Sequence, residues 1–328
     1  MNRNAAKVLK NFIQDNAIFI VVLILIIVTA IIEPSFITWD NLLNILRQNA
    51  VIGIVAVGMT YCIIAGLFDL SVGSIVSLSG VIVILSINAG VSDYIAVAYG
   101  LLAGIAVGVV NGLLVSLING SSGEAFIITY GMQVVVAAIA LFPSNGLFIA
   151  GRVQPGFFMS LGQGIMPIVI FLGLAAILQF VLVKTRYGRQ LCYIGSNINA
   201  ARMSGIRVKP NRVSYFAISG FMSGIAAIVL CSRVTSSNPT AGLGYEMDAI
   251  AGIVVGGTSL MGGSGSVLRT VLGIIIIGIM SNALNILGIT AYHQQIVKGL
   301  LIIAAVSVDI WNKRIKVREM SNEKAYIG

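Results

Sequence analysis

The chain has 328 residues, of which 58% are hydrophobic and only 9% charged, whereas a soluble domain carries about 25% charged residues. This composition excludes a soluble protein folded around one apolar core. The net charge of +9 therefore bears on membrane topology rather than on nucleic-acid binding.

Ten apolar segments follow one another along the chain, and most have the length that a helix needs to cross a bilayer, about 17 to 25 residues. They cover residues 17–32, 50–65, 71–87, 95–118, 125–142, 165–183, 213–231, 249–260, 267–287 and 296–308. The sequence therefore predicts an all-α membrane protein of about ten transmembrane helices, some of them short or broken. We expect a single membrane domain over residues 1–328.

Basic residues are concentrated between the sixth and seventh segments. Residues 184–212 contain no acidic residue and seven basic ones, namely Lys184, Arg186, Arg189, Arg202, Arg207, Lys209 and Arg212. Because cytoplasmic loops carry an excess of lysine and arginine, this loop is predicted to lie in the cytoplasm. The same rule places the N-terminus and the basic tail around Lys313 there, which requires an even number of spans.

Ten spans divide into halves of five, about residues 1–145 and 160–328. An odd number of spans per half makes the second half run inverted relative to the first. Asp69 opens the third span of one half, and Asp248 opens the third span of the other. Both spans are interrupted by glycines or polar residues. Such segments at matching positions of inverted halves indicate a transport pathway.

Polar side chains within the apolar segments are the candidate functional residues. A carboxylate in hydrocarbon costs several kcal/mol unless it is paired or hydrated. Asp69, with Ser71 two residues later, and Asp248 can therefore either cap helices or line a polar passage. Asn282 and Asn285 share one helical face and can either join helices or line a wet path. Two further polar residues, Asn111 and Gln133, are expected to join helices.

The cytoplasmic loop contains a second group of candidates. Ser196 or Asn197 can cap a short helix that contains Ala200, Ala201 and Met203, and Gly205 can end it. Such a helix is suited either to docking in a groove of a cytoplasmic partner or to lying along lipid headgroups. The residues proposed for docking are Gly195, Asn197, Ala200, Ala201, Arg202 and Gly205.

Motifs of catalysis and cofactor binding are absent from the sequence. It has no phosphate-binding glycine loop, no nucleophile motif and one histidine, His293. Its three cysteines, Cys62, Cys192 and Cys231, are scattered and form no metal-binding pair. We therefore expect no enzymatic activity, no metal and no cofactor.

A series of short motifs runs through nearly the whole chain. They are residues 41–46 (NLLNIL), 56–60 (AVGMT), 69–74 (DLSVGS), 125–129 (AFIIT), 244–250 (GYEMDAI), 256–260 (GGTSL) and 295–299 (QIVKG), with Gly195, Asn197, Ala200, Ala201 and residues 204–206 in the basic loop. With these motifs the chain resembles the permease subunits of bacterial ATP-binding-cassette (ABC) importers of the ribose, galactose, arabinose and xylose class.

The resemblance implies a role and a set of partners. It implies a permease of the bacterial inner membrane that imports a monosaccharide or related polyol. The expected partners are a second permease copy in a homodimer, two cytoplasmic ATPase subunits and an extracytoplasmic sugar-binding protein. It also implies that residues 195–206 form the coupling helix that receives the motion of the ATPase.

One alternative function is compatible with inverted halves. In an ion-coupled secondary transporter, Asp69 and Asp248 would bind a proton or Na⁺ at broken helices. Such a carrier has no need of the basic loop with its capped helix, which favours the ATP-driven importer.

Overall fold

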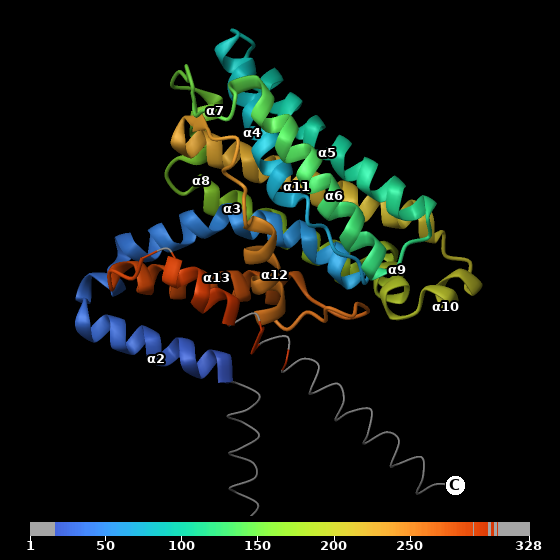
Figure 1. The fold of residues 1–328 in the computed structure, drawn as a ribbon. Coiled ribbons are helices and arrows are strands. Elements are labelled where there is room, and N and C mark those ends of the chain that lie inside the picture. Colours follow the sequence, from blue (N-terminus) through green and yellow to red (C-terminus); the bar gives the residue numbers. More distant parts are fainter. Residues whose placement is uncertain (1–16, 291, 301–302, 305–306, 308–328) are drawn as a thin grey trace, which may run out of the picture. The chain divides into compact units, whose positions relative to one another are not determined.

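The computed structural model describes residues 17–290, 292–300, 303–304 and 307, and these are mainly helical (Figure 1). Two compact units divide the chain, one of residues 1–45 and 275–328 and the other of residues 46–274. The helices α3 (Trp39–Ile64) and α13 (Val267–Ile286) each contribute residues to both units.

The first unit contains α2 (Ala17–Ile32), the short 3₁₀ helix η1 (Pro34–Ile37), the start of α3 and the end of α13. Helix α2 ends just before Pro34, because proline disfavours a helical conformation of the preceding residue. The last predicted span, residues 296–308, falls partly outside the described residues, and so does the basic tail around Lys313.

The second unit contains most of the helices. They are α4 (Val72–Asn88), α5 (Asp93–Leu117), α6 (Ser122–Leu141), η2 (Phe142–Ser144), α7 (Phe157–Gly162), α8 (Met166–Lys184), α9 (Arg186–Ser196), α10 (Ile198–Met203), α11 (Val208–Val234) and α12 (Tyr245–Val255). Two short strands, β1 (Ile149–Ala150) and β2 (Ser236–Ser237), pair antiparallel, with Ile149 opposite Ser237.

Helices α5 and α11 lie side by side at the centre of this unit, with α4 against both (Figure 1). Glycines recur every fourth residue along α5, at Gly100, Gly104, Gly108 and Gly112. A Cβ at Gly104 would overlap the carbonyl oxygen of Gly220, and one at Gly108 would overlap that of Phe216. The two backbones are therefore in contact, as small residues at four-residue spacing allow between helices in a membrane.

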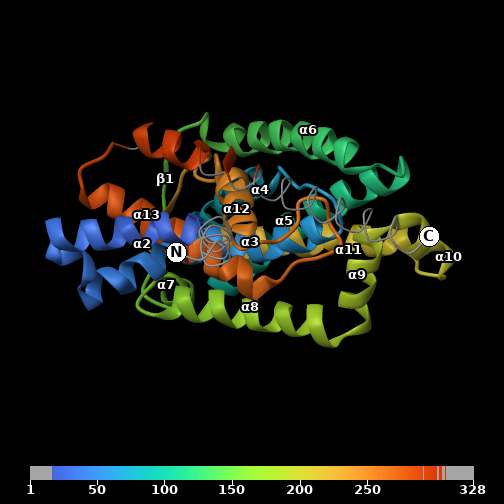
Figure 2. The same cartoon turned by 90° about the horizontal axis from the view of Figure 1, so that it is seen from below.

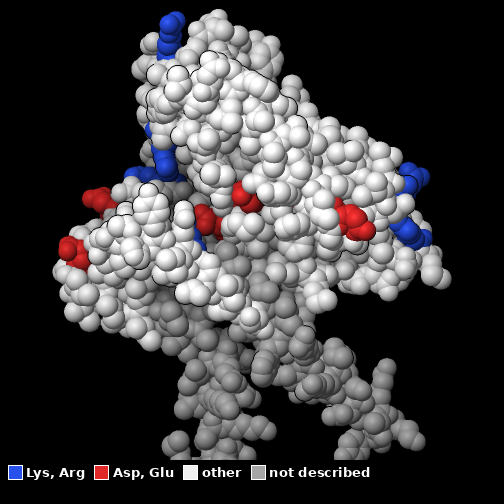
Figure 3. Space-filling model, in the orientation of Figure 1, with Lys and Arg blue, Asp and Glu red and all other residues white. Residues whose placement is uncertain are grey.

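Helices α6 and α8 lie on opposite sides of α5 and α11 in the view of Figure 2. Their outer faces are apolar and exposed, as shown by Ile127 at 71% and Phe180 at 62%. Figure 3 shows a mainly uncharged surface over α5 and α6, with basic side chains at the end of the unit where α9 and α10 lie. Lipid is the solvent that suits this surface.

Six helices among the described residues are long and apolar enough to cross a membrane. They are Trp39–Ile64, Asp93–Leu117, Ser122–Ser144, Met166–Lys184, Val208–Val234 and Val267–Ile286. The predicted multi-spanning, all-α architecture is confirmed at this level. The predicted spans 71–87 and 249–260 correspond to the shorter helices α4, with 17 residues, and α12, with 11 residues.

Several helix boundaries differ from the predicted ones by four residues or more, including the start of α11 at Val208 rather than at residue 213. Helix α3 begins at Trp39 rather than at residue 50. Its first turns contain polar residues, so they fall outside the apolar run from which the span was predicted. Helix α12 ends at Val255 rather than at residue 260. Gly256 caps it, and Gly257 has a φ of +79° that does not continue a helix.

Candidate functional site: a buried polar break between two helices

The chain breaks its helical path between α3 and α4 inside the second unit. Gly66, with a φ of +74°, ends α3, because glycine adopts the left-handed conformation without steric cost. The following segment is buried, with Leu67 at 0%, Asp69 at 1% and Ser71 at 0% exposure. The residues from Ala65 to Ser71, called the α3–α4 break below, therefore expose almost no polar group to solvent.

Asp69 holds this break together from within. Its Oδ1 accepts hydrogen bonds from the backbone N–H of Ser71 (3.2 Å) and from the Ser71 hydroxyl (2.7 Å). Asn111 of α5 donates in turn to the Ser71 hydroxyl at 2.7 Å. Ser71 itself occupies the N-cap position of α4, and its side chain makes no capping bond. Asp69 therefore stabilises the turn before the helix instead of occupying the cap position.

On one side of this cluster, several buried polar atoms make no hydrogen bond of good geometry with another described residue. They include Oδ2 of Asp69, Oδ1 of Asn111 and the hydroxyl of Ser219 on α11. The Ser219 hydroxyl is nevertheless a side-chain hydrogen-bonding neighbour of the Asp69 carboxylate. Buried polar atoms are normally hydrogen-bonded, so this group retains bonding capacity that a polar molecule could use.

Helix α6 holds the break from the opposite side. The Thr129 hydroxyl accepts a bond from the Leu70 N–H at 3.1 Å and lies 3.2 Å from the carbonyl oxygen of Phe68. About two turns earlier, the Ser122 hydroxyl donates to the carbonyl of Gly66. Both ends of the break are therefore attached to the first turns of α6.

A second buried carboxylate, Glu246, lies at the start of α12 and is 5% exposed. Its Oε1 accepts a bond from Gln133 of α6 at 3.0 Å, and its Oε2 is buried and makes no hydrogen bond of good geometry with another described residue. A Cβ on Gly73 would lie 2.5 Å from that Oε2. The N–H of Gly242 also donates to Ser77 at 3.1 Å, so the residues before α12 pack against α4.

The sequence analysis missed Glu246 because the predicted span began at residue 249. Helix α12 begins at Tyr245 instead, after Gly244 with its φ of +88°. Its first turn therefore includes Glu246 and Asp248. The cap position belongs to Gly244, so Asp248 is not the N-cap, and its side chain is partly exposed. The glycine before the acidic pair was the signal that could have moved the predicted boundary.

The two asparagines of α13 belong to the first unit. The side-chain amides of Asn282 and Asn41 exchange two hydrogen bonds, at 2.9 Å and 3.0 Å, and so join α13 to the start of α3. This is the helix-joining geometry, one of the two alternatives considered from the sequence. Asn285 is exposed and does not share that pairing.

The basic loop contains the predicted short helix, α10. The Asn197 side chain accepts bonds from the N–H groups of Asn199 and Ala200, each at 3.0 Å. At the other end, Gly205 has a φ of +78°, and its N–H donates to Arg202. Of the two predicted caps, Asn197 is therefore the one used, and Gly205 ends the helix as expected.

The two alanines of α10 do not share one outward face, as the docking prediction assumed. Ala200 is exposed, whereas Ala201 is 3% exposed and packs within the chain. Consecutive residues of a helix point about 100° apart, and Ala200 is the more accessible of the two. That Ala201 contacts a partner stays a prediction. Ala200 and Met203, which is 90% exposed, remain accessible.

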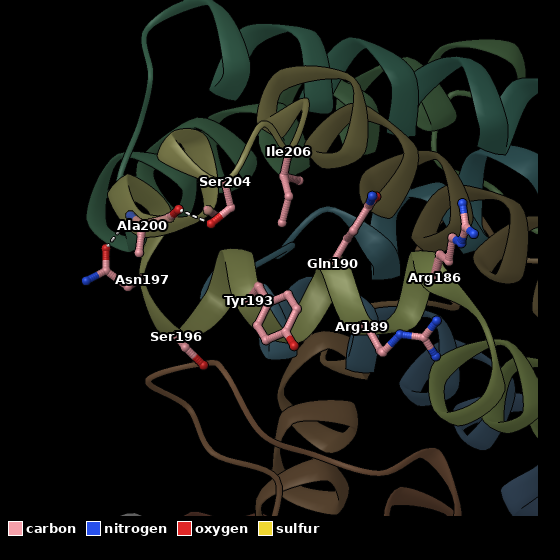
Figure 4. Close-up of a pocket in the computed structure, with 10 residues that line it drawn as sticks. Arg186, Arg189, Gln190, Tyr193, Ser196, Asn197, Ala200, Ser204 and Ile206 are labelled. Carbon is pink, nitrogen blue, oxygen red and sulfur yellow. Dashed lines mark hydrogen bonds between the residues drawn. The ribbon is translucent and has the colours of Figure 1, made fainter.

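A groove of about 550 Å³ lies between α9 and α10 (Figure 4). It is lined by Arg186, Arg189, Gln190, Tyr193, Ser196, Asn197, Ala200, Ala201, Ser204 and Ile206. Figure 4 shows Gln190 and Tyr193 of α9 facing the side that carries Ala200, Ser204 and Ile206. The lining includes two arginines and no acidic residue, so the groove suits an acidic or neutral protein surface.

Helix α9 is tied to α11 behind the groove. The hydroxyls of Tyr187 and Ser214 lie 2.6 Å apart, and the rings of Tyr187 and Tyr215 meet edge to face, 5.5 Å between centroids. Burial raises the pKa of the Tyr187 hydroxyl further above its usual range, because a buried phenolate would be poorly solvated.

The end of α9 meets two loops at a point where only glycine fits. A Cβ on Gly195 would overlap the carbonyl oxygen of Ile64 and lie 2.6 Å from the N of Gly263. The Gly263 N–H donates to the same Ile64 carbonyl at 2.8 Å. A Cβ on Gly262 would lie 2.8 Å from the Cα of Gly66. This glycine junction joins the basic loop to the α3–α4 break and to the α12–α13 loop.

Comparison with known proteins identifies the class of transporter. Residues 41–306 match the family described as the permease component of the branched-chain amino acid transport system. The chain belongs to this permease family. It is 39% identical over 305 residues to the ribose import permease protein of Haemophilus influenzae, covering 91% of this chain and 94% of that protein.

Other relatives are named for the transport of different sugars. The L-arabinose transport system permease protein of Escherichia coli is 36% identical over 302 residues, which are 90% of each chain. The D-allose transport system permease protein of the same organism is 37% identical over 295 residues, 89% of this chain and 90% of that one. The predicted ribose-permease-like class is confirmed. The chain is a permease subunit of an ABC importer, not an enzyme and not an ion-coupled carrier.

Proposed function

We propose that the chain imports a monosaccharide or related polyol across the bacterial cytoplasmic membrane as one of two identical permease subunits. Cytoplasmic ATPase subunits would supply the energy, and an extracytoplasmic sugar-binding protein would deliver the substrate. The names of relatives specific for ribose, arabinose and allose support this substrate class. The observation that carries the proposal is the α3–α4 break, a buried polar segment in an otherwise apolar unit.

The chemistry of the break suits a sugar. Hydroxyl groups need hydrogen-bond partners at every step through a membrane, because lipid offers none. Asp69, Ser71, Asn111 and Ser219 provide donors and acceptors, and several of their atoms make no hydrogen bond of good geometry with another described residue. We assign Asp69 and Ser71 to the translocation pathway, with Asp248 on the first turn of α12 as a further candidate.

The proposed topology is that of the sequence analysis. It comprises ten spans in two inverted halves, about residues 1–145 and 160–328, with both termini in the cytoplasm and a cytoplasmic coupling loop at residues 184–212. The short helices α4 and α12 support it, because transporters of inverted repeats place their substrate sites at short or interrupted helices. Asn282 is assigned to helix joining through its pair with Asn41, and Asn285, which is exposed, stays a candidate for lining a wet path.

The groove between α9 and α10 is the proposed docking site for the ATPase. Asn197, Ala200 and Ala201 line it. Gly195 and Gly205 lie near the ends of α9 and α10, and Arg202 bonds to Asn119 of the α5–α6 loop. Replacing Ala200 with Glu places a carboxylate in the groove, where a docked protein would bury it. We expect normal yield and membrane insertion, with loss of ATPase binding by a factor of ten or more, about 1.4 kcal/mol or above.

Matched variants separate docking from folding. Asn199→Glu adds the same charge to α10 outside the groove lining and is expected to bind the ATPase normally. Ala201→Glu buries the charge within the permease itself and is expected to reduce its yield and melting temperature. Pull-down of the ATPase subunit measures the effect. Full binding by Ala200→Glu would show that α10 lies along lipid instead.

The substrate class is tested by uptake. Proteoliposomes that contain the permease with its ATPase subunit and binding protein are supplied with labelled ribose, arabinose, allose or leucine. We expect one of the sugars to accumulate and leucine to remain outside. Accumulation of leucine alone would contradict the proposed substrate class.

A further inference from the structure

The loop between α5 and α6 is held by two arginines from the basic loop and the start of α11. The guanidinium of Arg202 donates to Oδ1 of Asn119 at 3.1 Å, and that of Arg212 donates to the carbonyl of Gly120 at 2.7 Å. Arg212 is only 5% exposed. A buried guanidinium that bonds a loop carbonyl fixes the position of the loop, because releasing it would leave both groups without a partner.

The same loop leads directly into the helix that holds the α3–α4 break. Ser121 and Glu124 form a capping box that fixes the start of α6 to the loop. Within the first turns of α6, Ser122 bonds to Gly66 and Thr129 bonds to Leu70. Unbroken contacts therefore run from α10, through residues 119–124, to both sides of Asp69.

The glycine junction provides a second attachment between the same two parts. At the junction, the end of α9 touches the carbonyl of Ile64, the last residue of α3. The helix pair α9–α10 is therefore attached to the α3 end of the break directly and to its α4 end through α6. A movement of α10 relative to α3 must either shift the break or separate one of these contacts.

We propose that Arg202 and Arg212 are positioning residues that couple movement of the docking helix α10 to the α3–α4 break through the α5–α6 loop. The inference rests on the proposed docking of the ATPase at α10 and adds the route by which docking reaches the pathway. Directional hydrogen bonds and tightly packed backbones transmit a displacement, whereas loosely packed side chains absorb it.

Variants of the loop can interrupt the route without unfolding the chain. Asn119 has a φ of +52°, so Asn119→Gly removes the amide that Arg202 holds and keeps a backbone conformation that glycine adopts freely. Arg212→Met removes the donor to Gly120, and Arg212→Lys retains one. Lys209→Met is the matched control, because it removes an exposed cation one turn earlier on α11.

A reporter next to the break is Cys62, which is fully buried near the end of α3. With Cys192 and Cys231 replaced by serine, N-ethylmaleimide reports only on this thiol. Labelling is measured in proteoliposomes of the assembled permease and ATPase, without nucleotide and with ATP and vanadate. We expect the labelling rate of the parent protein to change by about tenfold or more between the two states, since the break repacks as a unit.

The variants distinguish coupling from structural support. Asn119→Gly and Arg212→Met are expected to reduce this change to less than about twofold, because a charged hydrogen bond worth about a factor of ten is lost. Arg212→Lys should retain most of it and Lys209→Met all of it. ATPase co-purification should be unchanged in every case.

The outcomes that would contradict the proposal rule out different parts of it. Failure of the parent permease to retain the ATPase would contradict the proposed docking. Retention of the ATPase with no nucleotide effect on Cys62, or with the full effect in both loop variants, would overturn the coupling route. A purely structural role would lower yield, melting temperature and ATPase retention together.

Discussion

Replacing Asp69 with alanine is expected to reduce sugar uptake to less than a tenth and to lower the yield of assembled permease. The substitution removes the acceptor of both the Ser71 N–H and the Ser71 hydroxyl, which are buried. Each buried donor left without a partner costs about 1–3 kcal/mol. Uptake per assembled permease and the melting temperature of the purified protein measure the two effects separately.

Asp69→Asn is the matched control for this result. The amide keeps an acceptor for Ser71 and the volume of the side chain, so assembly should be close to normal. Any remaining loss of uptake then reports on the carboxylate itself, whose Oδ2 makes no hydrogen bond of good geometry with another described residue. Normal yield, melting temperature and uptake of Asp69→Ala would refute both the structural and the pathway roles of this residue.

The second large effect is expected at Gly195. A methyl group there would overlap the carbonyl of Ile64 and crowd the N of Gly263, and both obstacles are backbone atoms that cannot turn aside. Overpacking of this kind typically costs about 1–3 kcal/mol, and it would also break the Gly263 hydrogen bond to Ile64. We expect Gly195→Ala to lower the melting temperature markedly and to abolish ATP-driven uptake.

Two other glycines provide controls of different kinds. Gly173 lies within α8 with nothing near its missing Cβ, so Gly173→Ala should be neutral or slightly stabilising, because alanine favours a helix more than glycine does. Gly205 also has open space but a φ of +78°, so Gly205→Ala should cost about 1–2 kcal/mol through backbone strain. If Gly195→Ala behaved like Gly173→Ala, the junction would not be close-packed.

Local sequence rules predicted much of this structure. Apolar runs located the long helices, because a span is a property of consecutive residues. The cap at Asn197 and the end at Gly205 also depend only on nearby backbone groups, and α10 has both. Helix α9 was missed because it is amphipathic and carries two arginines, so a search for apolar runs passes over it.

The candidate site was harder to predict because it depends on contacts between distant segments. Gly195 meets Ile64, and Gln133 meets Glu246, across more than 100 residues in each case. No periodicity in one sequence records such pairs. The inward direction of Ala201 likewise depends on how α10 packs, not on its composition. The sequence therefore showed that burying the Asp69 carboxylate costs free energy, but it could not show which groups form hydrogen bonds with it.

The source of energy for uptake tests the central claim most directly. One set of proteoliposomes contains the permease, its ATPase subunit and its binding protein without any ion gradient, and a matched set contains the permease alone with a proton or Na⁺ gradient. Labelled ribose, arabinose and allose are each supplied to both sets. Our account predicts accumulation of a sugar only when ATP is present on the ATPase side, and neither uptake nor ATP hydrolysis by the permease alone. Accumulation driven by a proton or Na⁺ gradient, without the ATPase subunit, would contradict it.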